Sequence, residues 1–503
     1  MEFVKSAGLI GIEGHLVTVE CEELGGLPRL DLVGLPGAAV KESGDRVRSA
    51  IKNSGYSFPG GRLTINLAPA DTRKEGPVYD VPIMLGLLAA DRQIPSLPTD
   101  SVFIGELSLG GQLRPVNGVL SMALAAEEAG IRKLFLPAAN AQEAAFAENL
   151  TLYPAENMEQ ILEHLQGGEQ IPPYRPQPIA ETEGYALDFA EVMGQENAKR
   201  ALEVAAAGGH NILLCGSPGS GKSMMIKRFP SILPPMSRKE KLEVIRLYSA
   251  VGLGTQAAVS DARPFRSPHH TASAVSLTGG GNQQMRPGEI SLAHNGVLFL
   301  DELPEFSKYV LETLRQPLED GKITITRAAG SAEFPSRFQL LAAMNPCKCG
   351  WYGHASGRCH CTPESVKRYR SRISGPLLDR IDIQLEIQPV EYADLTAKKP
   401  AESSAAIRER VMVAREIQKQ RFAGTGILSN RDIPAGQRQQ YCPVSPEGEK
   451  LIQGAFERLG MTARSYDRVL KVARTIADLA GEEVIGAAHL AEAIQYRFSQ
   501  WNG

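Results

Sequence analysis

Residues 216–223, in the middle of the chain, read GSPGSGKS and match the phosphate-binding pattern G-x-x-x-x-G-K-S. Glycines let such a loop turn sharply and aim successive backbone N–H groups at an anion. The lysine can reach the β- and γ-phosphates of a nucleotide, and the final serine can bind Mg²⁺. We therefore predict that ATP and Mg²⁺ are bound by Gly216, Ser217, Pro218, Gly219, Ser220, Gly221, Lys222 and Ser223.

Two other apolar stretches end in side chains that suit phosphate chemistry. Residues 296–300 (GVLFL) precede Asp301 and Glu302, and residues 338–344 (FQLLAAM) precede Asn345. Ligands gather at the carboxyl ends of strands in open α/β sheets, so we expect these side chains near the nucleotide. Asp301 would belong to the magnesium shell, Glu302 would polarise the attacking water, and Asn345 would orient that water.

The elements that hold these side chains follow from apolar runs and helix signals. Residues 211–215 suit a buried strand before the loop, and residues 222–228 can open a helix after it. Further on, Arg380 directly precedes the β-prone run 381–387. These segments predict an α/β core built around a P-loop.

The order of P-loop, Asp-Glu, Asn and LLDRID (377–382) resembles that of the AAA+ ATPases, in the branch that includes the magnesium-chelatase motor subunit and the MCM helicases. Four longer segments resemble more closely the ComM (YifB) group of magnesium-chelatase-like competence proteins. They are GQENAKRAL at 194–202, FRSPHHTAS at 265–273, GEISLAHNGVLFLDELPEF at 288–306 and NPCKCG at 345–350. With the N-terminal region included, the resemblance covers nearly the whole chain.

The resemblance implies a homo-oligomeric ring, expected to be hexameric, in which an arginine of one subunit completes its neighbour's ATP site. By motif position this finger is Arg380, although a salt bridge with Asp379 or Asp382 would explain the same residue. The helicase relatives also use a second arginine, from a helical lid. Arg464 fits that position best, and Arg468, one helical turn later, is the alternative.

Four of the seven cysteines gather around one Gly-rich loop. They are Cys347, Cys349, Cys359 and Cys361. In a reducing compartment this density favours a metal over disulfides, and four thiolates can complete a closed zinc site. The C-x-C spacing also fits a redox-sensitive or vestigial thiol cluster. His354 and His360 could substitute as ligands.

Composition limits the partners of the whole chain. It has 54 basic and 57 acidic side chains and a net charge of −3, so any attraction to DNA must be local. Its 503 residues should hold several domains. No signal peptide is recognisable, and no apolar run approaches the length of a membrane-spanning helix. We therefore expect a cytoplasmic protein without a membrane partner.

A Pro-rich connector at 171–184 predicts a boundary between an N-terminal α+β domain, 1–170, and the motor. Residues 185–395 would form the AAA+ core. Residues 400–503 would form a helical lid, because their apolar residues are spaced as in helices and Ser-Pro-Glu at 445–447 is a helix start signal.

The N-terminal domain resembles a known enzyme domain without its reactive groups. Residues 105–118, with the helix and strand that follow, resemble the Lon-protease domain, whose fold is also seen in ribosomal protein S5. A peptidase of this kind needs a nucleophilic serine after a Gly-Pro and a lysine base in the helix. Here Gly76-Pro77 is followed by Val78, and Met122 takes the lysine position. We interpret this domain as an inactive scaffold for assembly or substrate positioning.

Two insertions in the core carry basic residues. The first, 251–295, contains Arg266 and resembles the helix-2 insert that enters the ring pore of the helicase relatives. The second, 322–337, contains Arg327 and Arg337 and predicts a hairpin before the sensor strand. We expect these arginines to bind DNA phosphates without sequence specificity, because aromatic platforms are sparse. The alternative is that they only keep the loops soluble.

The leading hypothesis is an ATP-hydrolysing DNA translocase or helicase that acts as a ring on single-stranded and branched DNA, with recombinase filaments as further partners. By resemblance to the ComM group, it would drive branch migration in homologous recombination during natural transformation. The alternatives are a protein-remodelling motor like the chelatase subunit and a regulator built from an inactive protease. DNA-stimulated ATP hydrolysis separates the first hypothesis from the others.

Overall fold

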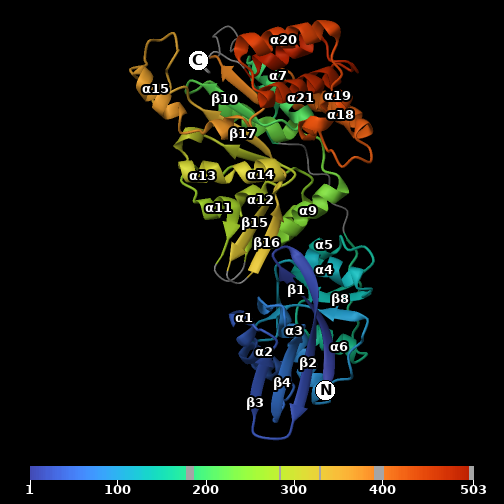
Figure 1. Cartoon of the computed structure of the whole chain (residues 1–503). Coiled ribbons are helices and arrows are strands. Elements are labelled where there is room, and N and C mark those ends of the chain that lie inside the picture. The colour runs from blue at the N-terminus through green and yellow to red at the C-terminus, as the bar shows by residue number, and fades with distance from the viewer. Residues whose placement is uncertain (177–185, 282–284, 328–329, 390–400, 498–503) are drawn as a thin grey trace.

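The computed structural model describes residues 1–176, 186–281, 285–327, 330–389 and 401–497. Figure 1 shows three parts in chain order: an N-terminal unit in blue and teal, a central motor in green to orange, and a helical lid in orange and red. Most of the predicted connector and a few residues of both predicted insertions lie outside the described part of the chain.

Two sheets form the N-terminal unit. The first has the order β1-β2-β4-β3, in which β3 and β4 are parallel and the other pairs antiparallel, and the second is parallel with the order β5-β8-β9. The strands are β1 (Glu2–Ile10), β2 (Glu13–Leu24), β3 (Arg29–Val33), β4 (Arg62–Ala68), β5 (Ser101–Phe103), β8 (Lys133–Pro137) and β9 (Thr151–Ala155), with a small ribbon of β6 (Glu106–Leu107) and β7 (Leu113–Arg114). The helices are α1 (Ala38–Lys41), α2 (Ser43–Asn53), α3 (Asp80–Ala90), α4 (Val119–Glu128), α5 (Ala141–Ala144) and α6 (Met158–Leu165).

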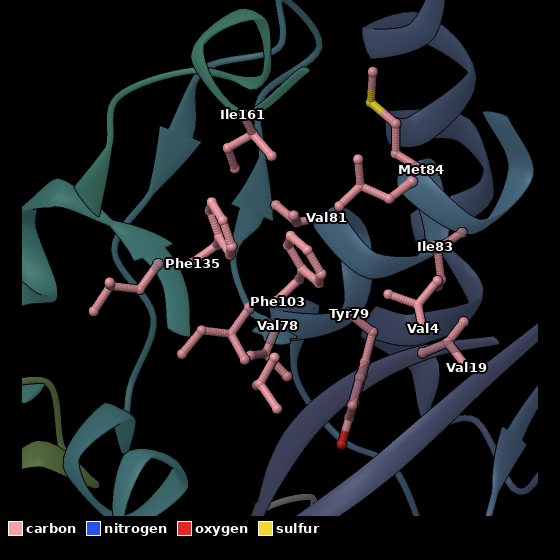
Figure 2. Packing of buried hydrophobic residues seen from close by; sticks show 14 of the residues in the cluster. Val4, Val19, Val78, Tyr79, Val81, Ile83, Met84, Phe103, Phe135 and Ile161 are labelled. Carbon is pink, nitrogen blue, oxygen red and sulfur yellow. The ribbon is translucent and has the colours of Figure 1, made fainter. Parts of the chain in front are cut away.

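Helix α3 forms the centre of this unit, since its residues 80–89 are all buried. A helix that is apolar on all sides must be covered on all sides. Figure 2 shows Ile83 and Met84 of α3 in the same packed region as Phe103 and Phe135, whose rings stack with centroids 4.7 Å apart. Helix and sheets therefore share one hydrophobic core.

The positions where a Lon-type peptidase needs its reactive groups belong to that core. Val78, after Gly76-Pro77, is 4 % exposed, and Met122 of α4 is 2 % exposed. The neighbouring hydroxyl of Ser121 donates to the Ile12 carbonyl oxygen at 2.6 Å and is thereby engaged. Packed apolar side chains thus fill the positions where a peptidase of this kind would carry its nucleophile and its base.

The motor is built on one parallel sheet of five strands, ordered β11-β14-β17-β10-β18. The strands are β10 (Ile212–Gly216), β11 (Phe265–Arg266), β14 (Val297–Leu300), β17 (Gln339–Met344) and β18 (Ile383–Ile387). All residues of β10, β14 and β17 are buried, as expected for parallel strands covered on both faces. The four strands predicted from apolar runs are confirmed, with ends shifted by no more than two residues.

Helices surround the motor sheet, and two small hairpins extend it. The helices are α7 (Glu196–Gly208), α8 (Lys222–Arg228), α9 (Arg238–Ser249), α10 (Gly254–Val259), α11 (Ala274–Thr278), α12 (Glu289–Leu292), α13 (Lys308–Thr313), α14 (Arg315–Asp320), α15 (Pro363–Arg370) and α16 (Gly375–Leu378). The hairpins are β12 (Gly279–Gly280) with β13 (Arg286–Pro287), and β15 (Lys322–Arg327) with β16 (Gly330–Pro335). The second hairpin confirms the one predicted over 322–337.

The lid packs at the amino ends of β10 and β18. Its helices are α18 (Ser404–Arg421), α19 (Arg438–Tyr441), α20 (Pro446–Leu459), α21 (Ala463–Leu479) and α22 (Ala487–Gln495). Arg431 donates to Oδ1 of Asn211, just before β10, at 3.0 Å, and Arg497 donates to the Ile381 carbonyl oxygen, just before β18, at 2.8 Å. These lid contacts therefore lie at the sheet edge opposite the one that carries the P-loop.

The N-terminal unit contacts the first insertion and the β15–β16 hairpin. The Gly118 N–H donates to the Ser249 carbonyl oxygen at 3.0 Å, which joins α4 to the end of α9. Ile12, in the turn between β1 and β2, shares a buried cluster with Phe334 of β16. Segment α10 of the first insertion packs on the N-terminal unit, where Ala258 meets Leu120, and the expected place of this insertion in a ring pore stays a prediction.

Candidate active site

The P-loop joins β10 to α8 at the carboxyl edge of the motor sheet. Gly219 and Gly221 have φ angles of 79° and 87°, which glycine adopts without steric cost. A Cβ at Gly216 would lie 2.8 Å from the Ile387 carbonyl oxygen, so β18 leaves no room for a side chain. Close packing and turn geometry thus account for the three glycines of the motif.

Lys222 is the first residue of α8 and faces back into the loop. Its Nζ donates to the carbonyl oxygens of Gly216 at 2.7 Å and Ser217 at 2.9 Å, and it lies 3.4 Å from Oδ1 of Asn345. Burial lowers the pKa of Lys222. The structure therefore brings Asn345, at the end of β17, to the lysine that would contact the phosphates.

Ser223 and Asp301 meet although they are 78 positions apart, and the Ser223 hydroxyl donates to Oδ2 of Asp301 at 2.6 Å. Both oxygens suit Mg²⁺, which takes oxygen ligands at about 2.1 Å and keeps several waters. The donor set therefore fits a magnesium ion held by Ser223 and Asp301, which would offset charge on the phosphates.

Glu302 follows Asp301 in a left-handed conformation, with φ 51°. Such a backbone costs a non-glycine residue of order 1 kcal/mol and is concentrated at functional sites. The conformation is held by the Glu302 N–H, which donates to Oδ1 of Asp301 at 2.9 Å. The carboxylate is about half exposed, so water can reach it.

His270 is a site residue that the sequence reasoning missed. Its Nδ1 lies 3.3 Å from Oε2 of Glu302, and its ring lies tilted by 34° against that of His269 with centroids 4.1 Å apart. The segment was assigned only to the pore insertion, although a His-His pair soon after a sheet strand was the available signal. The contact links the start of that insertion to the predicted water-polarising carboxylate.

Arg380 lies at the opposite edge of the sheet from the P-loop. Its carbonyl oxygen accepts from Nδ2 of Asn211 at 2.9 Å, and Asn211 directly precedes β10. The five residues of β10 therefore put about 16 Å of strand between Arg380 and its own P-loop. Its guanidinium forms an ion pair with Glu319, not with Asp379 or Asp382. Arg380 is therefore separated from the P-loop of its own chain by the length of β10.

A cavity of about 980 Å³ opens between this sheet edge and the lid. Its lining includes Glu319, Arg337, Arg380, Arg415 and Arg468. The Nη2 of Arg415 donates to the Ala206 carbonyl oxygen at 2.9 Å, and burial lowers its pKa to about 10. The cavity is a concave face on the side away from the P-loop, and cationic side chains in its lining outnumber acidic ones by nine to six.

The two lid arginines considered as sensors border the same region. Arg468 pairs with Asp382; burial alone raises the pKa of Asp382, but the charge of Arg468 and the hydrogen bond donated by the Asn211 N–H lower it overall. Arg464 is exposed at the start of α21. A hydrogen bond from Arg380, with the charges of Arg380 and Arg464, lowers the pKa of Glu319.

The arginines predicted to bind DNA are in different settings. Arg266 makes two hydrogen bonds to the carboxylate of Glu289, at 2.6 and 2.7 Å, which must break before it can bind a phosphate. Arg337 is exposed, and its stem packs beside Gly321 at the cavity rim. The side chain of Arg327 lies outside the described part of the structure.

The four predicted metal ligands form one cluster, with all four sulfur atoms within 4.8 Å of one another. The Sγ of Cys347 lies 3.3 Å from that of Cys349 and 3.9 Å from that of Cys359. Thiolates around a tetrahedral zinc ion, each at about 2.3 Å, are about 3.8 Å apart, so this set fits that geometry. Neither His354 nor His360 joins the cluster among the described residues.

The cysteine loop also contacts the P-loop. A Cβ at Gly350, whose φ is 84°, would lie 2.6 Å from the ring carbons of Pro218. Nε of Arg370 in α15 donates to the Pro346 carbonyl oxygen at 3.2 Å, which fixes the start of the loop. The shape of the cysteine loop is therefore coupled to the loop that would hold ATP.

In the described ranges, the helices lack the combination of length and apolar character that spanning a membrane requires. Three family models match the chain. Magnesium chelatase, subunit ChlI, matches residues 188–395; subunit ChlI of Mg-chelatase matches residues 19–140; and magnesium chelatase, subunit ChlI C-terminal, matches residues 401–497.

Full-length relatives confirm the resemblance drawn from the motifs. The chain is 43% identical over 501 residues to the YifB protein of Escherichia coli (strain K12), covering 99% of this chain and 97% of that one. It is 42% identical over 504 residues to the competence protein ComM of Haemophilus influenzae, with the same coverage. Lon protease 2 of Thermus thermophilus is 28% identical over 164 residues, or 30% of this chain and 20% of the protease.

Proposed function

The chain belongs to the ComM (YifB) family of magnesium-chelatase-like ATPases, and we propose that it is a ring-forming, ATP-dependent DNA translocase and helicase. In this proposal it promotes branch migration in homologous recombination during natural transformation. Family membership implies ATP hydrolysis. The name of the Haemophilus influenzae relative, a competence protein, supports a role in competence.

Each step of hydrolysis has a residue in the proposed mechanism. The P-loop N–H groups and Lys222 bind the phosphates, and Ser223 and Asp301 hold Mg²⁺. Glu302 accepts a proton from the attacking water, while Asn345 orients that water. Support comes from the 2.6 Å contact of Ser223 with Asp301 and the 3.4 Å separation of Lys222 from Asn345.

The observation that carries the ring is the position of Arg380 at the sheet edge opposite its own P-loop. In a homo-oligomeric ring of six subunits, Arg380 would contact the γ-phosphate held by the neighbour. Such a finger stabilises transition-state charge and raises the rate by about 10³ to 10⁵. Arg464, or alternatively Arg468, would act as the second arginine from the same face, because both border the cavity region.

DNA is the proposed substrate, single-stranded or branched, and recombinase filaments are proposed as further partners. Arg266, Arg327 and Arg337 remain the proposed phosphate contacts of the two insertions. The N-terminal unit, with its Lon-type and S5-like fold, would act as a scaffold that braces the β15–β16 hairpin through Ile12. The four clustered cysteines would hold a structural zinc ion.

A protein-remodelling motor of the magnesium-chelatase type is the second candidate. It is favoured by the family models, which match most of the chain and are named after the chelatase subunit. The two functions differ in the substrate that accelerates ATP hydrolysis, since a motor turns over faster when its own substrate is engaged.

The rate of ATP hydrolysis, measured without DNA, with single-stranded DNA and with forked DNA, separates the two candidates. We expect forked DNA to raise the rate and to be unwound in an ATP-dependent manner. Glu302→Gln is the control, which should bind the fork without unwinding it. Equal rates with and without DNA, together with intact forks, would leave the remodelling motor as the better proposal.

A further inference from the structure

The cysteine loop and α15 form a surface with a charge unlike that of the whole chain. Residues 345–372 contain six Lys and Arg and one Glu, a net charge of +5, whereas the chain carries −3. The basic residues are Lys348, Arg358, Lys367, Arg368, Arg370 and Arg372. We call residues 345–372 the basic loop region.

Four of these cations are free for a partner. Lys348, Arg358, Lys367 and Arg368 are exposed and form no ion pair with any carboxylate in the described part of the chain. By contrast, Arg372 is paired with Glu305 at 3.0 Å. Cations without a carboxylate partner keep their full attraction for phosphates.

Two aromatic rings lie among these charges. The Arg358 guanidinium lies 4.9 Å from the centre of the Trp351 ring, and the Arg370 guanidinium lies 5.4 Å from that of Tyr352. Tyr352 is 41% exposed. Aromatic rings and guanidinium planes are the groups on which unpaired bases stack. The basic loop region thus offers both phosphate and base contacts.

The position of this region separates it from the proposed pore contacts. Figure 1 shows α15 and the loop before it standing out from the motor, far from the β15–β16 hairpin. The cysteine cluster joins the two ends of the loop, because Cys349 and Cys359 lie with their sulfur atoms 3.6 Å apart. Lys348 and Arg358 directly precede these two cysteines, so the contact holds the backbone of both cations at the same end of the loop.

We propose that the basic loop region binds single-stranded DNA outside the pore, an inference that rests on the proposed function as a DNA motor. Stacking surfaces favour a single strand over a duplex, whose bases are already stacked on one another. The near absence of carboxylates favours a polyanion. In a motor that separates the strands of DNA, such a site would hold a single strand outside the ring.

The test compares two variants with equal changes in charge. The first carries Lys348→Gln, Arg358→Gln, Lys367→Gln and Arg368→Gln. The matched control carries Lys52→Gln, Arg132→Gln, Lys450→Gln and Arg458→Gln, four exposed cations that also form no ion pair within the described ranges. Affinity for a labelled oligo(dT) is measured by fluorescence anisotropy over a series of salt concentrations, and thermal unfolding checks that both variants fold.

The loop variant should bind oligo(dT) roughly tenfold or more weakly, and the slope of log K against log salt should fall by about 3, because each lost single-strand phosphate contact lowers it by about 0.7. The control should keep the wild-type affinity and slope. A further variant, Tyr352→Leu, keeps the charge and should weaken oligo(dT) binding about fivefold through lost stacking, with duplex affinity unchanged.

The possible outcomes distinguish a failure of the proposed binding site from a failure of the proposed function. Wild-type affinity and slope in the folded loop variant would overturn the inference, and this is also the result expected if the region binds an acidic protein. Wild-type protein that binds neither oligo(dT) nor forked DNA would instead overturn the proposed function itself.

Discussion

In the proposed mechanism Lys222 and Glu302 act at different steps, so the effects of their substitutions should be distinguishable. Lys222→Ala removes the ammonium that would neutralise the phosphates, and we expect it to abolish ATP binding. Glu302→Gln keeps the shape but cannot accept a proton, so ATP should stay bound while turnover falls by about a hundredfold or more. Nucleotide affinity and turnover are measured for both variants. Normal turnover in Glu302→Gln would remove that residue from catalysis.

His270 is expected to act through Glu302 as a positioning residue, because the two side chains are 3.3 Å apart. His270→Ala should lower kcat roughly ten- to a hundredfold by releasing the carboxylate, while ATP affinity stays close to that of the wild type. His269→Ala, which removes the neighbouring ring without touching Glu302, is the control. An unchanged kcat in His270→Ala would show that the contact has no role in turnover.

At the residue scale, side chains directly after a strand were predictable and those brought in by a loop were not. Asp301 and Asn345 were found because the carboxyl ends of neighbouring parallel strands must converge. His270 reaches Glu302 from a segment 32 positions earlier, and no spacing rule relates the two. The ion pair of Arg380 with Glu319 was missed for the same reason.

The cysteine loop would couple a bound zinc ion to the P-loop, because Gly350 packs against Pro218. Replacing all four clustered cysteines by Ser should remove one bound zinc ion per chain and weaken ATP binding, because little else orders this Gly-rich segment. Metal analysis and nucleotide affinity are the measurements. Cys442→Ser, at a buried thiol in the lid, is the control. Freshly prepared, reduced wild-type protein without zinc would contradict the prediction.

Glu143 is buried where the N-terminal unit meets the motor. Its Oε1 accepts from Asn140 at 2.8 Å, and a Cβ at Gly254 of α10 would lie 1.6 Å from its Oε2. Burial raises the pKa of Glu143. A carboxyl with a raised folded-state pKa stabilises the fold when protonated, and this stability is lost as pH rises through that pKa.

Glu143→Gln should therefore raise the free energy of unfolding by of order 1 kcal/mol at mildly alkaline pH, because it removes a buried charge and keeps the shape. In acid, where the wild-type carboxyl is protonated, the difference should vanish. Chemical unfolding at both pH values measures this, with exposed Glu128→Gln as the control. A variant less stable than the wild type at alkaline pH would contradict the sign.

At the element scale, local signals predicted strands and caps well. Ser445 caps α20 and Pro446 is its first residue, as the Ser-Pro-Glu signal indicated. Contacts between distant segments were not predictable, since Ile12 and Phe334 meet only because the N-terminal unit folds onto the hairpin. In the same way, α10 of the first insertion meets the N-terminal unit through Ala258 and Leu120, a contact that no local signal indicates.

At the scale of the whole molecule, the residues proposed to act in catalysis divide between two faces. The P-loop, Asp301, Glu302 and Asn345 gather at the carboxyl edge of the sheet, while Arg380 lies at the amino edge beside the lid. In the proposed mechanism, one chain therefore holds two halves of a site and no complete one. We propose that neighbouring subunits of a ring join these halves.

Mixing two inactive variants tests that claim most directly. Lys222→Ala and Arg380→Ala should each lack ATP turnover, the first by losing nucleotide and the second by losing the finger. In rings assembled from equal amounts of both, roughly a quarter of the interfaces pair an intact P-loop with an intact finger, so up to about that fraction of wild-type hydrolysis should return. No return of hydrolysis in mixed rings that are shown to assemble would contradict a site shared between subunits.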